Sequence, residues 1–217
     1  MLTTYFQCHI ETVGSGRTDT GVHAIQQFCH FDAPTEVDQA EFKYNVNSML
    51  PADIALVAVY KVPPNAHARF YAISRSYQYH ISRNKNPFRQ QTSYNFWVNL
   101  DVEKMNNACR IMLGERDFKS FSKVKTSVEH FRCKLTEARW EADNESYRFY
   151  VSANRFLRGM VRSMVGTLID LGTGKIDANR FHEIIDFKDR RLAGRSAPAE
   201  GLFLTRVEYP DGLLNNN

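Results

Sequence analysis

Strand-like and helix-like segments alternate along this chain, and that order constrains its fold more than any other feature. Ala138, Trp140 and Ala142 alternate with polar residues up to Asp143–Ser146, and a second alternating run begins at Tyr147. Two such runs around a short polar turn predict a β-hairpin. No internal repeat or low-complexity tract breaks the order. Hairpins mixed with helices favour an α+β fold with a largely antiparallel sheet.

The other elements are predicted from their own start and stop signals. We expect further strands over residues 26–31, 54–62, 74–81 and 202–209. We expect helices over residues 38–50, 101–112, 154–169 and 177–187. The first helix follows a capping box at Thr35–Asp38, and the second begins at a capping Asp101 and ends before Gly114. Ile54–Val62 is apolar on both faces, which is typical of a buried strand.

The polar segment Asn84–Asn95 is the best candidate for a connection between two halves. We therefore expect an N-terminal α+β half over residues 1–99 and a C-terminal α+β half over residues 100–212. The closing residues 213–217, which end in three asparagines, are expected to be a disordered tail. With 43% hydrophobic residues, a chain of 217 residues can bury such cores.

Several classes of protein are disfavoured by composition. No apolar run approaches the length of a membrane span, and the N-terminus lacks the pattern of a secretory signal. The four cysteines show no paired metal-ligand spacing, so we expect reduced thiols in the cytoplasm and no metal site. No cofactor motif is present, and no cofactor is expected.

The charge balance points weakly to an anionic partner. The net charge is +4, and arginine outnumbers lysine by 18 to 10. A guanidinium can form a bidentate contact with a phosphate, whereas an ammonium acts as a point charge. This arginine bias favours a nucleic-acid partner modestly, because arginine-rich surfaces are also common in other soluble proteins.

The segment Gly14–His23 carries the most chemistry. Asp19 lies in it among three glycines, with Arg17 two residues earlier and His23 four residues later. Glycines allow positive φ angles and close approach to a ligand. A carboxylate beside a guanidinium is favoured in its ionised form, which a nucleophile or general base requires. An ordinary surface turn uses the same residue types, so the segment alone leaves both interpretations open.

Four segments, in order, resemble the tRNA pseudouridine synthase A family, and together they cover most of the chain. They are Gly-Arg-Thr-Asp-Thr-Gly-Val-His at 16–23, the run from His67 to Tyr79 ending in Arg-Ser-Tyr-Gln-Tyr, the run from Ser152 to Thr167 containing Phe-Leu-Arg-Gly-Met-Val-Arg, and the run from Ala193 to Leu202 leading into Val-Glu-Tyr-Pro at 207–210. The resemblance implies two similar α+β halves with a basic cleft between them.

The resemblance also implies an activity and its residues. It implies an isomerase that converts uridine to pseudouridine in the anticodon stem-loop of tRNA, at positions 38–40, and that acts as a homodimer. Asp19 matches the catalytic aspartate, and Arg162 matches the arginine that lies against it. Arg17 matches a residue that helps to draw the target nucleotide out of the stack. Tyr77 matches the tyrosine that packs on the target base, whereas Tyr79, on the same strand face, is expected in the core.

The predicted helix 154–169 adds a geometric expectation. Arg155, Arg158 and Arg162 are spaced three and then four residues apart, which would place them on one helix face. No acidic residue lies between Asn154 and Leu168, so a pairing anion must come from outside the helix. We expect Arg155 and Arg158 to contact RNA.

One departure from the family keeps other functions open. Family members carry a longer segment before the motif, with a first strand and helix, whereas only Met1–Val13 precede it here. A noncatalytic RNA-binding relative is therefore a second hypothesis. A small-molecule hydrolase that uses Asp19 and His23 is a third, although no second carboxylate stands at a defined spacing.

Overall fold

The computed structural model describes residues 1–123 and 128–214, which form two compact units. The first unit comprises residues 1–16, 28–72 and the C-terminal residues from Tyr209. The second comprises Arg17–Gln27 and Ile73–Glu208. The sheet of the second unit contains strands that precede residue 99 and strands that follow it. The predicted boundary between two halves at residues 99 and 100 stays a prediction. Of the predicted tail, residues 215–217 lie outside the described residues.

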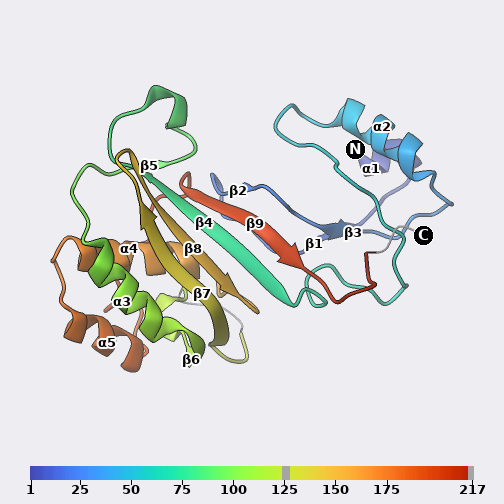
Figure 1. Cartoon of the computed structure of the whole chain (residues 1–217). Helices are drawn as coiled ribbons and strands as arrows, with labels where there is room; N and C mark the ends of the chain where they lie inside the picture. The colour runs from blue at the N-terminus through green and yellow to red at the C-terminus, as the bar shows by residue number, and fades with distance from the viewer. Residues whose placement is uncertain (124–127, 215–217) are drawn as a thin grey trace. The chain divides into compact units, whose positions relative to one another are not determined.

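A seven-stranded mixed sheet forms the centre of the second unit (Figure 1). Its strands are β2 (His23–Ala24), β9 (Leu202–Glu208), β4 (Ser74–Ser82), β8 (Ser146–Ala153), β7 (Arg132–Ala142) and β6 (Gly114–Asp117), in that order, with β5 (Tyr94–Asn95) paired to β4. The pairs β2–β9 and β4–β5 are parallel, and the others are antiparallel. The predicted α+β class and the predicted hairpin, which is β7–β8, are confirmed.

The helices of this unit begin at side-chain caps where the sequence provides one. They are α3 (Val102–Met112), α4 (Met160–Gly172) and α5 (Ala178–Asp186), with 3₁₀ turns η1 (Pro87–Arg89) and η2 (Lys119–Phe121). Asp101 accepts a hydrogen bond from the backbone of Lys104, and Asp177 accepts one from Arg180. Each carboxylate thereby satisfies a backbone N–H group of the first helical turn. Among the described residues, no helix has both the length and the apolar character needed to cross a membrane.

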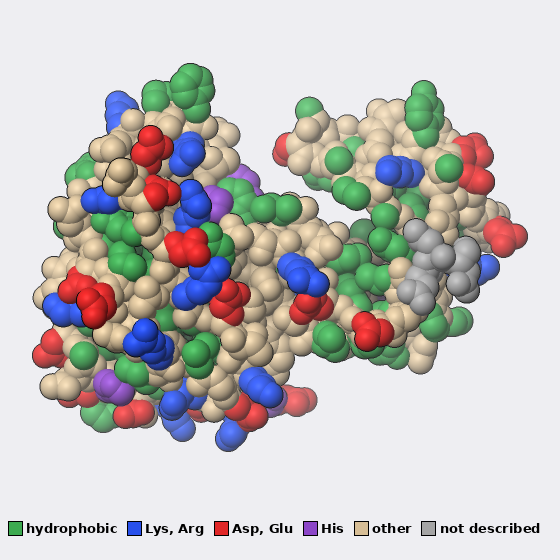
Figure 2. Space-filling model, viewed as in Figure 1, with side chains coloured by type: hydrophobic (Ala, Val, Ile, Leu, Met, Phe, Trp, Pro, Cys, Tyr) green, Lys and Arg blue, Asp and Glu red, His purple; other side chains and the backbone are tan. Residues whose placement is uncertain are grey.

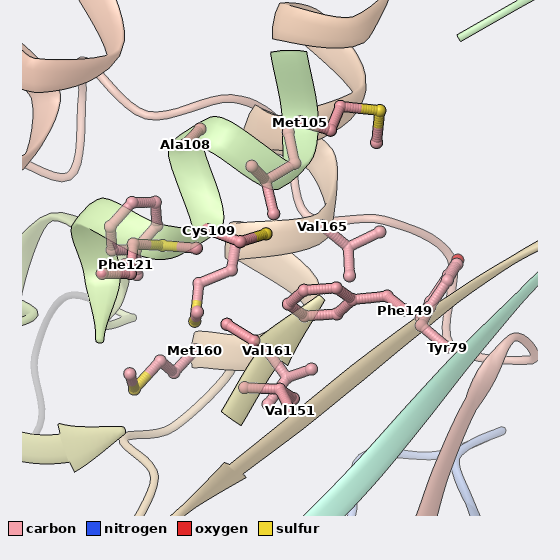
Figure 3. Close-up of a cluster of buried hydrophobic side chains, with 14 of the residues drawn as sticks. Tyr79, Met105, Ala108, Cys109, Phe121, Phe149, Val151, Met160, Val161 and Val165 are labelled. Carbon is pink, nitrogen blue, oxygen red and sulfur yellow. The ribbon is translucent and has the colours of Figure 1, made fainter. Parts of the chain in front are cut away.

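The core lies between the sheet and helices α3, α4 and α5. Tyr79 of β4 and Phe149 of β8 are fully buried, and the ring of Phe149 points towards Cys109 of α3 and Val165 of α4 (Figure 3). Since alternate residues of a strand face opposite sides, Tyr77 shares this side and His80 faces away from it. The expectation that Tyr79 belongs to the core is confirmed.

The predicted helix 154–169 begins six residues later than expected, at Met160. Gly159 has a φ of 69°, a left-handed conformation that interrupts helical geometry just before α4. Arg155 and Arg158 therefore precede the helix, and the prediction that they share a helix face with Arg162 is wrong. The apolar residues of this region are buried, at Leu157, Val161, Met164, Val165 and Leu168.

The first unit is small and built around an aromatic cluster. It contains α1 (Leu2–Phe6), β1 (Val13–Gly14), β3 (Cys29–His30) and α2 (Gln39–Met49), and β1 pairs antiparallel with β3. Tyr5, Phe6 and Phe31 surround Phe42 of α2 with ring centroids 4.9–5.9 Å from its ring. The strand expected over 26–31 is reduced to the two residues of β3.

The strand predicted over 54–62 is wrong. These residues have no strand partner, and Val57 is 75% exposed while Ile54 is 56% exposed. An apolar run does not form a strand by itself, because each strand needs a hydrogen-bonded neighbour. The apolar pattern is present in the sequence, but no strand among the described residues pairs with this segment.

Candidate active site

Asp19 lies in the turn that leads into β2. The N–H of Val22 donates to the carbonyl of Asp19 at 3.0 Å, which closes the turn. Gly21 has a φ of 81°, and a methyl group there would lie 3.3 Å from the Cβ of Ala199. A glycine is therefore favoured here both by backbone conformation and by space. The parallel pairing of β2 with β9 fixes the end of this turn to the sheet.

Arg162 of α4 holds the carboxylate of Asp19. Its Nη1 donates to Oδ2 of Asp19 at 2.9 Å, and the two side chains are 21% and 29% exposed. Its Nε donates to the carbonyl of Ala197 at 2.7 Å, and the N–H of Ala197 donates to the carbonyl of Arg162 at 2.9 Å. The guanidinium is thus oriented from two sides, which a planar fork of donors permits.

The segment 194–199 supplies this orientation because it lies directly on α4. A Cβ at Gly166 would lie 1.7 Å from the carbonyl oxygen of Arg195, so only glycine allows this approach. The N–H of Gly194 donates to the hydroxyl of Thr167 at 2.9 Å. On the other side, the hydroxyl of Tyr79 donates to the carbonyl of Pro198 at 2.8 Å. Burial raises the pKa of Tyr79, so its hydroxyl remains a donor.

Lys123 is a second cation at the carboxylate, and the sequence reasoning missed it. Its Nζ lies 4.0 Å from Oδ1 of Asp19, on the oxygen that Arg162 does not bond. Its N–H donates to the carbonyl of Arg158 at 2.9 Å, and its side chain passes over Gly159, with Cγ 3.7 Å from the point where a Cβ on that glycine would lie. No spacing rule connects it to Asp19, because the two residues meet only in the folded chain.

Tyr77 lies on β4, with its ring edge-on to Phe156 at a centroid distance of 5.1 Å. Phe156 belongs to the segment 154–159, so Tyr77 is brought to the stretch that carries Arg155 and Arg158. Burial raises the pKa of Tyr77, and the nearby Arg75 partly opposes that shift. The ring is partly buried, and its hydroxyl is expected to stay protonated near neutral pH.

The remaining predicted arginines are less constrained. Arg17 is exposed, and its guanidinium has no hydrogen bond or ion pair with the other described residues. Arg158 is exposed, and Arg155 has an Nη1 at 3.5 Å from Nε2 of His130. All three can reach solvent, as a phosphate contact requires. Their contact with RNA stays a prediction.

Metal-ligating side chains do not gather in the described part of the chain, where no group of three His, Cys, Asp or Glu residues could hold an ion. The four cysteines are free thiols, two exposed and two buried. At Asp19 the groups that lie against the acid are cations rather than further acids. The arrangement can therefore present one carboxylate, held by Arg162 and approached by Lys123, to a reacting group.

Residues 108–210 match the family described as tRNA pseudouridine synthase. Proteins called tRNA pseudouridine synthase A from Bacteroides thetaiotaomicron and Bacteroides fragilis are 41% and 44% identical to this chain. The first alignment covers 99% of this chain and 81% of the relative, and the second covers 98% and 85%. The chain belongs to the tRNA pseudouridine synthase family. A relative of the same name from Porphyromonas gingivalis is 44% identical over 94% of this chain and 83% of its own length.

Family membership confirms the resemblance that was predicted from four sequence segments. The mostly antiparallel sheet with helices is consistent with the fold expected for such a protein. The matched region 108–210 contains Arg162 and the segment 194–199, whereas Asp19 is covered by the alignments with whole relatives. The roles of individual residues stay predictions that the geometry now makes specific.

Proposed function

We propose that this protein is a tRNA pseudouridine synthase that isomerises uridine in tRNA. The observation that carries the proposal is the ion pair of Asp19 with Arg162 at 2.9 Å, in a chain of this family. Two segments that resemble the family motifs, far apart in the sequence, meet in that pair. The relatives are named for the same activity.

The reaction needs few protein groups. The bond between the ribose C1′ and N1 of the base breaks, the detached base rotates, and a bond from C1′ to C5 forms. C5 loses its proton and N1 gains one, so no electrons are gained or lost and no second substrate is consumed. What the protein must supply is a carboxylate at the reacting nucleotide, a surface for the base, and cations for the phosphates.

We assign each of these tasks to a residue. Asp19 acts on the reacting nucleotide, and Arg162 orients its carboxylate through the two hydrogen bonds described above. Lys123 adds positive charge at the other carboxylate oxygen. Tyr77 offers an aromatic ring for the extruded base, where stacking contributes about 1–3 kcal/mol. Arg17, together with Arg155 and Arg158, contacts RNA phosphates.

A tritium-release assay tests the proposal directly, because C5 of uridine loses its hydrogen only when the new bond forms. The wild-type chain should release tritium from tRNA that carries 5-tritiated uridine, and Asp19→Ala should abolish release while tRNA binding persists. Binding of tRNA without release by either protein would instead support a noncatalytic RNA-binding relative. Asp19→Asn serves as the near-isosteric variant, since it keeps the shape of the side chain.

The finer points rest on the family resemblance. We propose that the uridines lie in the anticodon stem-loop at positions 38–40, that the active protein is a homodimer, and that it acts in the cytoplasm. The free thiols suit a reducing compartment. Mapping of pseudouridine in tRNA treated with the protein tests the first point. Light scattering on the purified protein, with and without tRNA, tests the second.

A further inference from the structure

A cavity lies in the same unit as Asp19, on the side of the sheet away from α3 and α4. It has a volume of about 410 Å³, and its lining includes His80, Arg89, Thr92, Arg148 and Phe203. His80 and Arg148 are directly opposed on β4 and β8, and both side chains point away from the core. Arg89 reaches it from the 3₁₀ turn η1. We call it the basic pocket.

The basic pocket is joined to the turn of Asp19 by a stack of three rings. His23 and His80 lie on either side of Phe203, each with its ring centroid 4.6 Å from the phenyl ring and nearly parallel to it. Nε2 of His23 lies 2.6 Å from the carbonyl oxygen of Gln91, in the loop that carries Arg89. In the view of Figure 2, histidine and basic side chains come together over the region where β9 begins and β4 ends. The stack holds the Arg89 loop on the sheet.

The charge inside the pocket is unbalanced. Its lining includes two arginines and a histidine and no carboxylate. Arg148 has an outside partner, Asp143, at 3.1 Å, whereas the guanidinium of Arg89 pairs with no carboxylate in the described part of the chain. Burial lowers the pKa of His80, and the charges of Arg148, Arg89 and His23 lower it further. An anion placed between the two guanidinium groups would offset that repulsion.

We propose that the basic pocket binds a backbone phosphate of the tRNA substrate, at a site separate from Asp19. The guanidinium group of Arg89, that of Arg148, which binds Asp143 through Nη2, and the exposed hydroxyl of Thr92 match the donors that phosphate oxygens accept. The pocket is exposed to solvent at Arg89 and Thr92, so a polymer can reach it without opening the fold. The identity of the ligand as RNA rests on the proposed function.

The first test measures the Kd of the full chain for a tRNA transcript at several salt concentrations. We expect Arg89→Gln and Arg148→Gln each to weaken binding by about tenfold at low salt, and each to reduce the salt slope by about one. Arg139→Gln is the matched control, because Arg139 lies on the same sheet but pairs with Glu137 and Glu141 and lies over the ring of Tyr150. If the variant that combines Arg89→Gln with Arg148→Gln has the wild-type Kd and the wild-type salt slope, the proposal is wrong.

The second test uses an RNA oligonucleotide without uridine, which cannot be a substrate. It should move the imidazole NMR signals of His80 in the wild-type chain and leave them unmoved in the double variant. If inorganic phosphate moves these signals and RNA does not, the pocket binds small anions only and the RNA assignment is wrong. Tritium release by the same wild-type preparation is measured in parallel. If no tritium is released, the proposed isomerase activity is wrong. The binding data still show whether the basic pocket binds RNA.

Discussion

At the scale of single residues, the guanidinium of Arg162 bonds two groups at once, the carboxylate of Asp19 and the carbonyl of Ala197. A lysine would keep the positive charge, but its single nitrogen would have to donate to both the carboxylate and the carbonyl. We expect Arg162→Lys to slow single-turnover tritium release by about tenfold or more, since a hydrogen bond to a charged group contributes about 1.5–3 kcal/mol. Arg180→Lys, on the exposed side of α5, is the control. A wild-type rate for Arg162→Lys would show that the second bond is not needed.

Lys123 is the residue whose role is least expected from the sequence. Its ammonium lies 4.0 Å from Asp19 and is half exposed, so the interaction is screened by solvent. We expect Lys123→Met to lower the single-turnover rate by about two- to fivefold, which corresponds to about 0.5–1 kcal/mol, and Lys123→Arg to restore most of it. Lys119→Met is the control, because the Lys119 ammonium lies over the ring of Phe131 instead. Equal single-turnover rates for Lys123→Met and Lys119→Met would show that Lys123 does not contribute to the reaction.

At the scale of elements, the contact between α4 and the segment 194–199 depends on Gly166. A methyl group there would lie 1.7 Å from the carbonyl oxygen of Arg195, so the segment must move. We expect Gly166→Ala to lower the free energy of unfolding by about 1–3 kcal/mol in urea titrations and to reduce tritium release as well. Gly16→Ala is the control for the unfolding measurement only, since no described heavy atom beyond its chain neighbours lies within 4 Å of the Cβ that it would add. A stable and active Gly166→Ala variant would contradict this account of how Arg162 is placed.

Elements with local signals were predictable from the sequence. Asp101 and Asp177 each accept a backbone hydrogen bond at the start of a predicted helix, and this depends only on neighbouring residues. The capping box predicted at Thr35–Asp38 is wrong in its position, because Asp38 itself is the cap of α2 and accepts from the N–H of Glu41. The start of α4 was not predictable from periodicity, because the positive φ of Gly159 overrides an otherwise helical pattern. The strand prediction for Ile54–Val62 was wrong for a different reason, because an apolar pattern does not indicate whether a partner strand exists.

At the scale of the whole molecule, only those residues of the candidate site that lie in family-like motifs were predictable from the sequence. Asp19 and Arg162 were matched to the family, and the structure brings them together at 2.9 Å. Lys123 and the segment 194–199 could not be paired with Asp19 in advance. Their positions depend on contacts between parts of the chain that are far apart in sequence, and no periodic signal reports such contacts.

Alkaline stability is a further property of the whole chain. Burial raises the pKa of Cys109 from 9.0 to about 12 and that of Cys133 from 9.0 to about 11. The folded protein keeps both thiols protonated, whereas the unfolded chain ionises them above pH 9. The stability they contribute is therefore complete below pH 9 and is lost as the pH rises from 9 towards 11–12.

We expect the free energy of unfolding to fall across this range by about 1.4 kcal/mol per pH unit for each fully ionised thiol. Urea titrations between pH 8 and pH 10.5, chosen as a roughly centred window on the thiol transition, measure that slope. Replacing Cys109 and Cys133 together by alanine should make the slope shallower, whereas Cys8→Ala, at an exposed thiol, should leave it unchanged. Part of the slope should remain in the double variant, because burial also raises the pKa values of Cys29, Tyr77 and Tyr79. An unchanged slope in the double variant would mean that other groups govern the alkaline loss.

The parallel pairing of β2 with β9 joins the turn of Asp19 to a strand far along the chain. During synthesis on the ribosome the acid emerges early, yet its turn has no sheet edge to join until β9 follows. A nascent chain that ends before Leu202 already contains Asp19, Lys123 and Arg162, but β2 then has no β9 to pair with. The turn of Asp19 can therefore be tied to the sheet at this edge only after β9 has left the ribosome.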